Sequence, residues 1–286
     1  MCRLFGFRSV IHSQVHSSLI SADNALLNQG FKNPDGWGVA YYIYNTPHII
    51  KSTQSAVDDS LFKKVSGIVS SQTVLAHLRK ATQGSLSSLN THPFQHGHWV
   101  FAHNGNIKNF NDIQDQIISL THKEFLKFKL GDTDSESLFY YLLSQISNEV
   151  DLNSNHPVDT YIKILNNAIT KLCSIIGKIS LHGQANPNEN FLTFILTNGK
   201  VMIGHQGGQS LHLSTYKKQC PERDTCSYFE PQCEKEVHTK KVNHLIFSSE
   251  PLSGENVWKE MKPGEIIGVD ERMVLTKGKI KLPLNR

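Results

Sequence analysis

Met1-Cys2-Arg3-Leu4-Phe5-Gly6-Phe7-Arg8 opens the chain, and its second residue decides how the rest is interpreted. If Met1 is removed, Cys2 carries both a thiol and a free α-amino group. A deprotonated thiol is a nucleophile, and an α-amine with a pKa of about 7.7–8.0 is a base near working pH. One residue then supplies a nucleophile and its base. Met-Cys alone is more often an ordinary cysteine near a frayed terminus, so the interpretation depends on later motifs.

The composition of the 286-residue chain excludes several classes of protein. A hydrophobic fraction of 38% is enough for a sizeable core. The net charge of +4, spread without long runs, does not indicate nucleic acid as the main partner. No apolar stretch approaches the roughly 18 residues of a membrane span. The N-terminus has no apolar signal-peptide region, and the five cysteines are an odd number, so we expect a reduced, cytoplasmic protein without a membrane partner.

The predicted elements run in the order strands, then helices, then strands. Apolar, aromatic and β-branched residues predict strands at residues 3–10, 37–44, 74–79, 99–103, 191–197, 200–205, 244–249, 265–269 and 273–276. Apolar residues at spacings of three and four predict helices at residues 17–29, 58–69, 132–146 and 157–175. This order favours an α+β fold with packed sheets over an alternating α/β barrel or doubly wound sheet.

Two Asn-Gly pairs give strong turn signals. Asn198-Gly199 lies between two predicted strands and predicts a hairpin. Asn104-Gly105 follows the strand predicted at residues 99–103 and predicts a second turn, in which Gly105 offers a backbone N–H.

The polar stretch at residues 217–241 holds Cys220, Cys226 and Cys233, and we expect it to be a loop or insertion within a single domain at residues 2–286. Spacings of five and six residues differ from the two to four that are usual in zinc sites. Free thiols are the simplest interpretation, and a metal site and a redox pair stay open. A fourth metal ligand would have to be His238, His244 or Cys173.

Four motifs follow the N-terminal cysteine in a fixed order: Asp35-Gly36-Trp37-Gly38, His77-Leu78-Arg79-Lys80-Ala81-Thr82-Gln83-Gly84, His103-Asn104-Gly105-Asn106 and Asp132-Thr133-Asp134-Ser135-Glu136. With them, the chain resembles the class II, N-terminal nucleophile (Ntn) glutamine amidotransferases, and most closely the stand-alone bacterial members that lack a fused synthase domain. The resemblance covers essentially the whole chain. It implies an Ntn-hydrolase fold, a four-layer αββα sandwich with two mainly antiparallel sheets.

The resemblance implies three catalytic residues. Hydrolysis of a carboxamide needs a nucleophile, a base and donors for the oxyanion. Cys2 supplies the first two, and the resemblance assigns the oxyanion to the Asn104 side chain and the Gly105 backbone N–H. The alternative for Asn104-Gly105 is a plain turn.

The resemblance also implies three substrate-binding residues. Arg79 supplies the planar fork that suits the α-carboxylate of glutamine, and Thr82 helps to hold that group. Asp134 supplies an anion for the α-ammonium. The alternatives are a surface ion pair for Arg79 and a helix N-cap for Asp134, a role that Asp132 or Thr133 could take instead.

The reaction implied is cleavage of the side-chain amide of glutamine, or of a γ-glutamyl amide, through a γ-glutamyl thioester on Cys2. The resemblance implies no cofactor and no metal, a small-molecule substrate, and room for a separate acceptor or synthase subunit. One alternative is a γ-glutamyl peptide hydrolase with no ammonia acceptor. An alternative of another class is a non-catalytic binding module of the same fold, held by a metal at the three cysteines.

Overall fold

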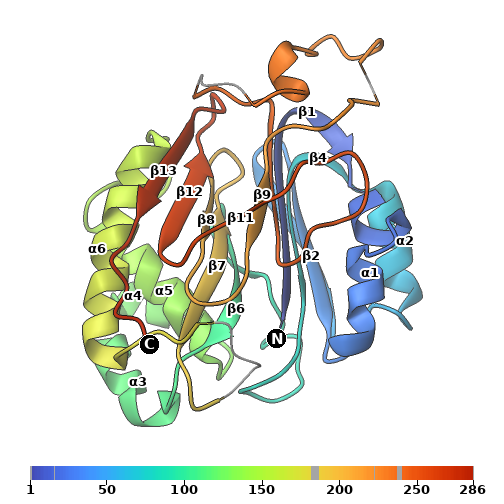
Figure 1. Cartoon of the computed structure of the whole chain (residues 1–286). Coiled ribbons are helices and arrows are strands. Elements are labelled where there is room, and N and C mark those ends of the chain that lie inside the picture. Colours follow the sequence, from blue (N-terminus) through green and yellow to red (C-terminus); the bar gives the residue numbers. More distant parts are fainter. Residues whose placement is uncertain (1, 16, 182–186, 222, 237–239, 286) are drawn as a thin grey trace.

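The computed structural model describes residues 2–15, 17–181, 187–221, 223–236 and 240–285, and its strands form two antiparallel sheets (Figure 1). Sheet A has the order β11-β9-β10-β1-β4-β2-β3. Its strands are β1 (Arg3–Gln14), β2 (Trp37–Ile43), β3 (Thr46–Ser52), β4 (Ser70–Leu78), β9 (His212–Ser214), β10 (His244–Ser248) and β11 (Lys259–Glu260). Sheet B has the order β13-β12-β8-β7-β6-β5. Its strands are β5 (Phe94–His96), β6 (Trp99–Asn106), β7 (Phe191–Thr197), β8 (Met202–His205), β12 (Glu265–Val269) and β13 (Leu275–Lys279).

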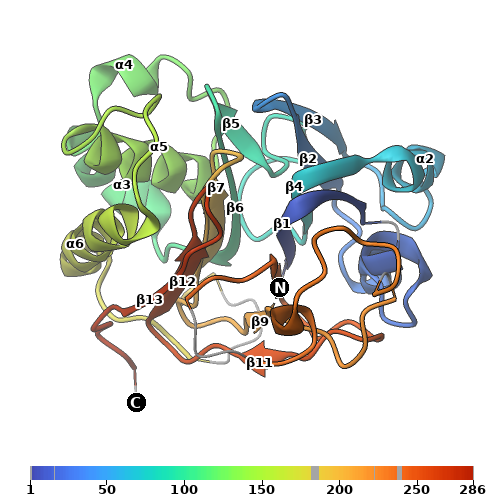
Figure 2. The ribbon, with the colours of Figure 1, turned by 90° about the horizontal axis from the view of Figure 1, so that it is seen from above.

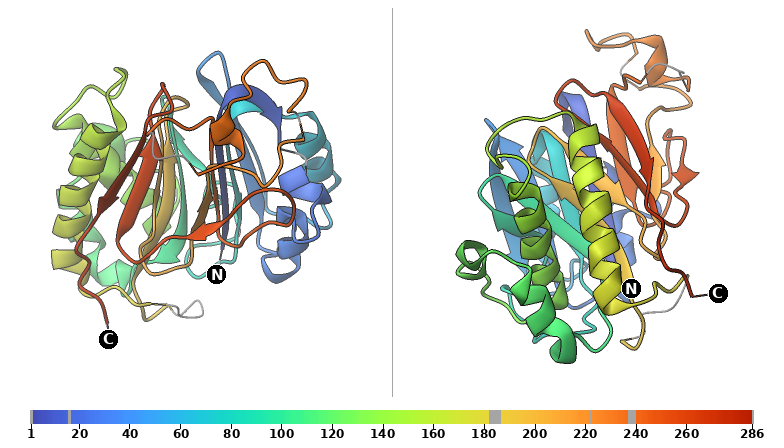
Figure 3. Two further views of the ribbon diagram at one scale, coloured as in Figure 1. Left: turned by 45° about the horizontal axis from the view of Figure 1, so that its top comes forward. Right: turned by 90° about the vertical axis from the view of Figure 1, so that its left-hand side faces the viewer.

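Helices cover the outer faces of both sheets, which gives four layers (Figures 1 and 2). The helices beside sheet A are α1 (Leu26–Gln29) and α2 (Ser60–Ile68). Those beside sheet B are α3 (Phe110–Ser119), α4 (Lys123–Leu126), α5 (Asp134–Ser147) and α6 (Val158–Ile176). Figure 3 shows the long helices α5 and α6 lying across one face of sheet B. The predicted α+β sandwich with two mainly antiparallel sheets is therefore confirmed.

Alternation of side chains along each strand produces three hydrophobic clusters. On β1, Leu4 belongs to the cluster between the sheets, whereas Phe5 faces the helices beside sheet A. On β6, Ala102 belongs to the same inter-sheet cluster, whereas Phe101 packs on the helices beside sheet B. Both sheets are thus buried on both faces, and polar side chains become accessible mainly where the strands end.

Two expectations about local structure are wrong. The helix expected at residues 17–29 is interrupted: a π-helical turn covers Ser17–Ser21, α1 covers only Leu26–Gln29, and a 3₁₀ turn covers Gly30–Lys32. The turn expected at Asn104-Gly105 is absent from this described segment, because both residues lie inside β6 and pair with β7. The other pair, Asn198-Gly199, does connect the antiparallel strands β7 and β8 as predicted.

The helix predicted from residue 132 begins at Asp134, and its cap is Thr133. The Thr133 hydroxyl accepts a hydrogen bond from the Glu136 N–H at 3.2 Å, which satisfies one of the free donors of the first turn. Thr133, and not Asp134, is therefore the N-cap of this helix. This rules out the alternative role that the sequence left open for Asp134.

The described part of the insertion at residues 217–241 contains one short 3₁₀ helix, Pro231–Cys233, and is otherwise irregular. It lies at the end of the sandwich away from the N-terminus, as the orange segment at the top of Figure 1 shows.

Candidate active site

Four segments distant in sequence meet at the end of the sandwich where β1 begins. Arg3 pairs with Leu78, so the start of β1 lies beside the end of β4, from which Arg79 follows. Asp134 accepts a hydrogen bond from the Ile107 N–H at 2.6 Å, so the start of α5 lies against the end of β6. The antiparallel order of both sheets therefore collects Cys2, Arg79, Asn104 and Asp134 at one end.

The Cys2 thiol is half-buried and contacts the backbone of Lys80. The Lys80 N–H donates to Sγ at 3.3 Å, and the Lys80 carbonyl lies 3.5 Å from Sγ. Burial raises the pKa of the Cys2 thiol, and the Lys80 N–H and the positive charge of Arg79 oppose that effect. The thiolate thus has a backbone donor and a nearby cation to stabilise it.

Asn104 lies on β6, a strand of sheet B that contacts β1 across the space between the sheets. Its side chain follows Ala102 by two residues, so it points toward sheet A, as the side chain of Leu4 points toward sheet B. Asn104 is 2% exposed, its Oδ1 is buried without a hydrogen-bond partner, and its Nδ2 makes no hydrogen bond with the residues that the structure describes. Most buried amides are paired, so this unpaired one indicates a functional role.

The backbone of Gly105 is directed away from the interior of sheet B. Gly105 lies opposite Leu192, whose N–H donates to Gly207 and whose carbonyl accepts from His205, both on the far side of β7. The pair is therefore a non-hydrogen-bonded one, and the Gly105 N–H points toward the open edge of β6. A side chain cannot be added here, because a Cβ would lie 2.0 Å from the His103 ring and 2.1 Å from the Phe191 carbonyl.

Arg79 is a buried cation outside every ion pair found among the described residues. Its Nη1 donates to the Ser85 carbonyl at 3.1 Å, and its Nη2 donates to the carbonyls of Gln83 at 3.0 Å and Gly84 at 3.3 Å. Burial lowers its pKa. These carbonyls use three of the five donors of the guanidinium, which keeps donors for a ligand.

Asp134 is a buried carboxylate that likewise forms no ion pair within the described parts of the chain. Its Oδ1 accepts from the Ser135 N–H at 2.8 Å, and its Oδ2 accepts from Ile107. Burial raises the pKa of Asp134 to about 6, and these hydrogen bonds oppose the rise. An uncompensated cation and an uncompensated anion at one end of the sandwich would match the two charged groups of an α-amino acid.

Thr82 is half-buried in the same loop as Arg79 and makes no side-chain hydrogen bond with a described neighbour, so its assignment to the carboxylate stays a prediction. Trp37, in contrast, is a core residue: it packs against Phe62 on the helix side of sheet A, and its Nε1 donates to Asp59.

Other residues fix the loop that carries Arg79, and the sequence did not identify their roles. Asp35 accepts from the Ala81 N–H at 2.8 Å, which ties the Asp-Gly-Trp-Gly motif to this loop. Gln83 donates to Asn106 at 2.6 Å, and Asn90 donates to Asp132 at 2.5 Å. The spacing of the motifs gave no signal for these contacts, because each joins segments that meet only in the folded chain.

Among the described residues, no group of three or more His, Cys, Asp or Glu side chains could hold a metal ion. Cys220, Cys226 and Cys233 are free thiols, and His238, one of the three ligands considered for them, lies outside the described residues, as does Met1. The metal-held binding module therefore has no support in the described residues. Nor does any described helix combine the length and apolarity that crossing a bilayer requires.

The model of one protein family, described as the class-II glutamine amidotransferases, matches residues 1–282. A "Putative glutamine amidotransferase" of Haemophilus influenzae is 32% identical over 176 residues, 60% of this chain and 51% of that protein, so this chain spans about half the length of that relative. A γ-glutamyl-hercynylcysteine sulfoxide hydrolase of Mycobacterium tuberculosis is 38% identical over 77 residues, 27% of this chain and 33% of that protein.

The fold has solved counterparts. The structure of a glutamine aminotransferase class-II domain protein from Silicibacter pomeroyi superposes with a TM-score of 0.61 at 19% identity. The superposition covers 98% of this chain and 99% of that one, so the arrangement of sheets and helices is shared over the whole length.

Proposed function

Since the chain belongs to the class-II glutamine amidotransferases, we propose that it cleaves the side-chain amide of glutamine, or a γ-glutamyl amide, through a thioester on Cys2. The observation that carries this proposal is the buried Asn104 amide, which makes no hydrogen bond with the described residues and lies on β6, a strand that contacts the strand beginning next to Cys2. A structural amide would be paired, whereas an oxyanion donor stays open until the transition state.

The first half of the proposed reaction forms the thioester. Removal of Met1 frees the Cys2 α-amine, which accepts the proton of the thiol. The thiolate attacks the amide carbon, and Asn104 Nδ2 and the Gly105 N–H donate to the oxyanion. The C–N bond then breaks, and the α-ammonium of Cys2 returns its proton to the leaving ammonia.

The second half resolves the thioester. Water adds to the γ-glutamyl carbonyl, the same α-amine accepts its proton, and the same two donors stabilise the second oxyanion. The C–S bond breaks, which releases the γ-carboxylate and regenerates the thiol. Throughout, Arg79 and Thr82 hold the α-carboxylate and Asp134 holds the α-ammonium.

Two versions of this chemistry differ in the leaving group. Transfer of ammonia to an acceptor would require a further partner, whereas a γ-glutamyl hydrolase needs only water. The similarity to a protein named as a γ-glutamyl-hercynylcysteine sulfoxide hydrolase favours considering the second version for this chain. Parallel assays of ammonia release from glutamine and of amine release from γ-glutamyl peptides distinguish them: the better substrate is the one with the larger kcat/KM.

The Arg79 assignment predicts a binding defect. Arg79→Lys keeps the charge but loses the fork. We expect KM for glutamine to rise about 10- to 100-fold, since a hydrogen bond to a charged group contributes about 1.5–3 kcal/mol, with a smaller change in kcat. Arg3→Lys is the control, because Arg3 lies beside Cys2 but is paired with Glu250. An unchanged KM with a reduced kcat in Arg79→Lys would exclude the carboxylate role.

The Asp134 assignment predicts a pH dependence. With its pKa raised to about 6, Asp134 loses its negative charge as the pH falls through that value, and with it the attraction for an α-ammonium. We therefore expect kcat/KM for glutamine to fall below a pH of about 6. In Asp134→Asn, kcat/KM is already low near neutral pH and the titration near pH 6 disappears, whereas the decrease that protonation of the Cys2 α-amine causes below a pKa of about 7.7–8.0 remains. A wild-type profile that is flat from pH 7 to pH 5 would contradict the assignment.

All five cysteines are free, and Cys2 acts only as a thiol, so we propose that the enzyme works in a reducing compartment such as the cytoplasm.

A further inference from the structure

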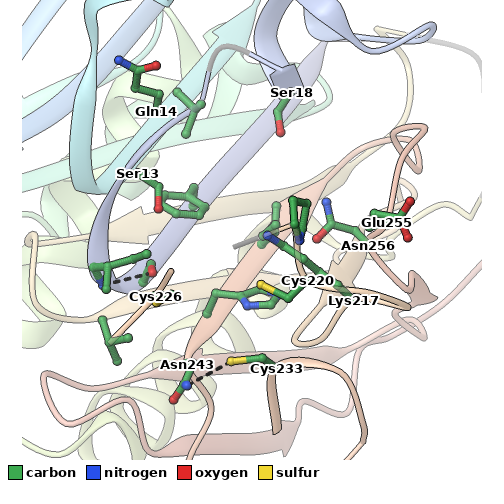
Figure 4. Close-up of a pocket in the computed structure, with 18 of the residues that line it drawn as sticks. Ser13, Gln14, Ser18, Lys217, Cys220, Cys226, Cys233, Asn243, Glu255 and Asn256 are labelled. Carbon is green, nitrogen blue, oxygen red and sulfur yellow. Dashed lines mark hydrogen bonds between the residues drawn. The ribbon is translucent and has the colours of Figure 1, made fainter. Parts of the chain in front are cut away.

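A cavity of about 700 Å³ lies beside the insertion, at the end of the sandwich away from the N-terminus. Figure 4 shows residues that line it. Its walls come from the end of β1, the start of β10, the segment 253–256 and the insertion that carries three cysteines. Phe7, the first residue of β1 that lines the cavity, lies five residues after Cys2, roughly 16 Å at about 3.3 Å per residue. None of Cys2, Arg79, Asn104 and Asp134 lines the cavity, so it is separate from the proposed active site. Its volume is that of a small-molecule pocket.

Two lining residues carry buried polar atoms without partners. His244 is 8% exposed, and its Nε2 is buried and makes no hydrogen bond with the described residues. The Oδ1 of Asn256 is buried and unpaired in the same sense. An unpaired buried polar atom is destabilising, so two of them lining one cavity indicate a ligand that pairs with them.

Lys217 supplies the positive charge among the described residues that line the cavity. This half-buried residue lines the cavity, its N–H donates to the Cys233 carbonyl, and its ammonium is in no ion pair among the described residues. Burial, aided by Lys217, lowers the pKa of His244 to about 3, so its ring is neutral and offers one N–H. Glu255, the carboxylate among the described lining residues, is exposed and forms no ion pair with Lys217.

An apolar surface lies beside His244. Phe7 and Ile246, neighbours across β1 and β10, line the cavity, and Ile246 is on the same face of β10 as His244. A ligand that contacts both the polar and the apolar residues therefore combines an acidic group with an apolar body.

We propose that this cavity binds a small organic anion whose carboxylate or phosphate meets Lys217 and His244 and whose apolar body lies on Phe7 and Ile246. In this proposal the described part of the insertion, through Lys217, Cys220 and Cys226 among others, forms a wall of a ligand site. The proposed ligand site does not depend on the glutamine chemistry. The test of this site can therefore fail while the proposed function holds, and the reverse.

Two free cysteines that line the cavity can be used to measure whether it is occupied. Cys220 and Cys226 are half-buried free thiols that line it, whereas Cys233 is buried and accepts a hydrogen bond from Asn243 Nδ2 at 3.2 Å (Figure 4). A ligand in the cavity covers the first two thiols and leaves Cys2 untouched.

The binding test uses anilinonaphthalene sulfonate, an aromatic anion, as the probe. We expect one saturable site on the full chain, and we expect Lys217→Met to raise Kd at least about tenfold, the effect of losing a charge-assisted contact. Lys218→Met is the matched control: Lys218 is the next residue, is exposed and is not among the lining residues, so its Kd stays at the wild-type value. Thermal melts of both variants check folding. Equal Kd values in all three proteins, or no saturable binding, would overturn the proposal.

The location test measures alkylation of each cysteine by iodoacetamide with and without the probe. At a concentration ten times Kd, mass action slows alkylation of Cys220 and Cys226 about tenfold, and the rate at Cys2 is unchanged. Equal protection at Cys2, or none at Cys220 and Cys226, would place the probe elsewhere and overturn the proposal. Displacement of the probe by benzoate or by inorganic phosphate identifies the preferred acidic group. If neither anion displaces the probe, the proposal is contradicted.

Discussion

Asn104→Ala is expected to lower kcat for glutamine by about 10²–10³-fold while the melting temperature stays at the wild-type value. The loss in rate is that of one oxyanion donor. The stability is retained because the Asn104 amide makes no hydrogen bond within the described structure, so its removal leaves no partner unsatisfied. Steady-state kinetics and a thermal melt on the same preparation measure both quantities.

The matched control is Asn106→Ala, two residues further along the same strand. The Asn106 amide is fully used: Nδ2 donates to the carbonyls of Pro187 and Glu189, and Oδ1 accepts from Gln83. We expect this variant to melt at a lower temperature, because three partners lose their hydrogen bonds. If Asn104→Ala also loses activity only in step with its stability, Asn104 is a structural residue and the oxyanion donor lies elsewhere.

A preparation that retains Met1 is expected to lose at least about 100-fold in kcat, since a positioned general base contributes about 10²–10⁴-fold. The proposed base is the α-amine of Cys2, which exists only when Cys2 is N-terminal. The experiment uses a removable N-terminal extension: intact mass reports whether the chain begins at Met1 or at Cys2, and kinetics are measured before and after its removal.

Cys2→Ser with the extension removed separates the base from the nucleophile. The variant keeps the α-amine but replaces the thiol with a weaker nucleophile, so it also loses activity and no longer adds a glutamine-analogue electrophile by mass. Full activity in a preparation whose mass includes Met1 is incompatible with the α-amine as base.

The motifs predicted the family correctly, but one of them predicted the wrong local conformation. Asn104-Gly105 has the composition of a turn, yet it lies in β6, because pairing with β7 from Val100 to Asn106 satisfies a whole ladder of backbone groups. A turn propensity of two residues is small beside that ladder. The resemblance assigned both residues to the proposed oxyanion site whatever their local conformation. The donors differ in geometry, however, because they lie at the edge of a strand and not in a turn.

The helix expected at residues 17–29 failed for a related reason. Its apolar residues have helical spacing, but Asn24 lies among them and accepts a hydrogen bond from the Ser253 N–H, far away in the sequence. Asn28 donates to the Asp23 carbonyl at 2.8 Å. Contacts of polar side chains with the backbone compete with a continuous helix.

The sequence by itself determined the class of fold, the order of most strands and helices, and the candidate residues, because periodicity and motif spacing are local properties of the chain. Only the tertiary structure decided which of these residues meet: Cys2 with Lys80, Asp134 with Ile107, and the open Asn104 amide opposite the nucleophile strand. It also decided that His244 and Lys217 share a cavity. Burial and the satisfaction of buried polar groups depend on segments far apart in sequence, so no local pattern could reveal them.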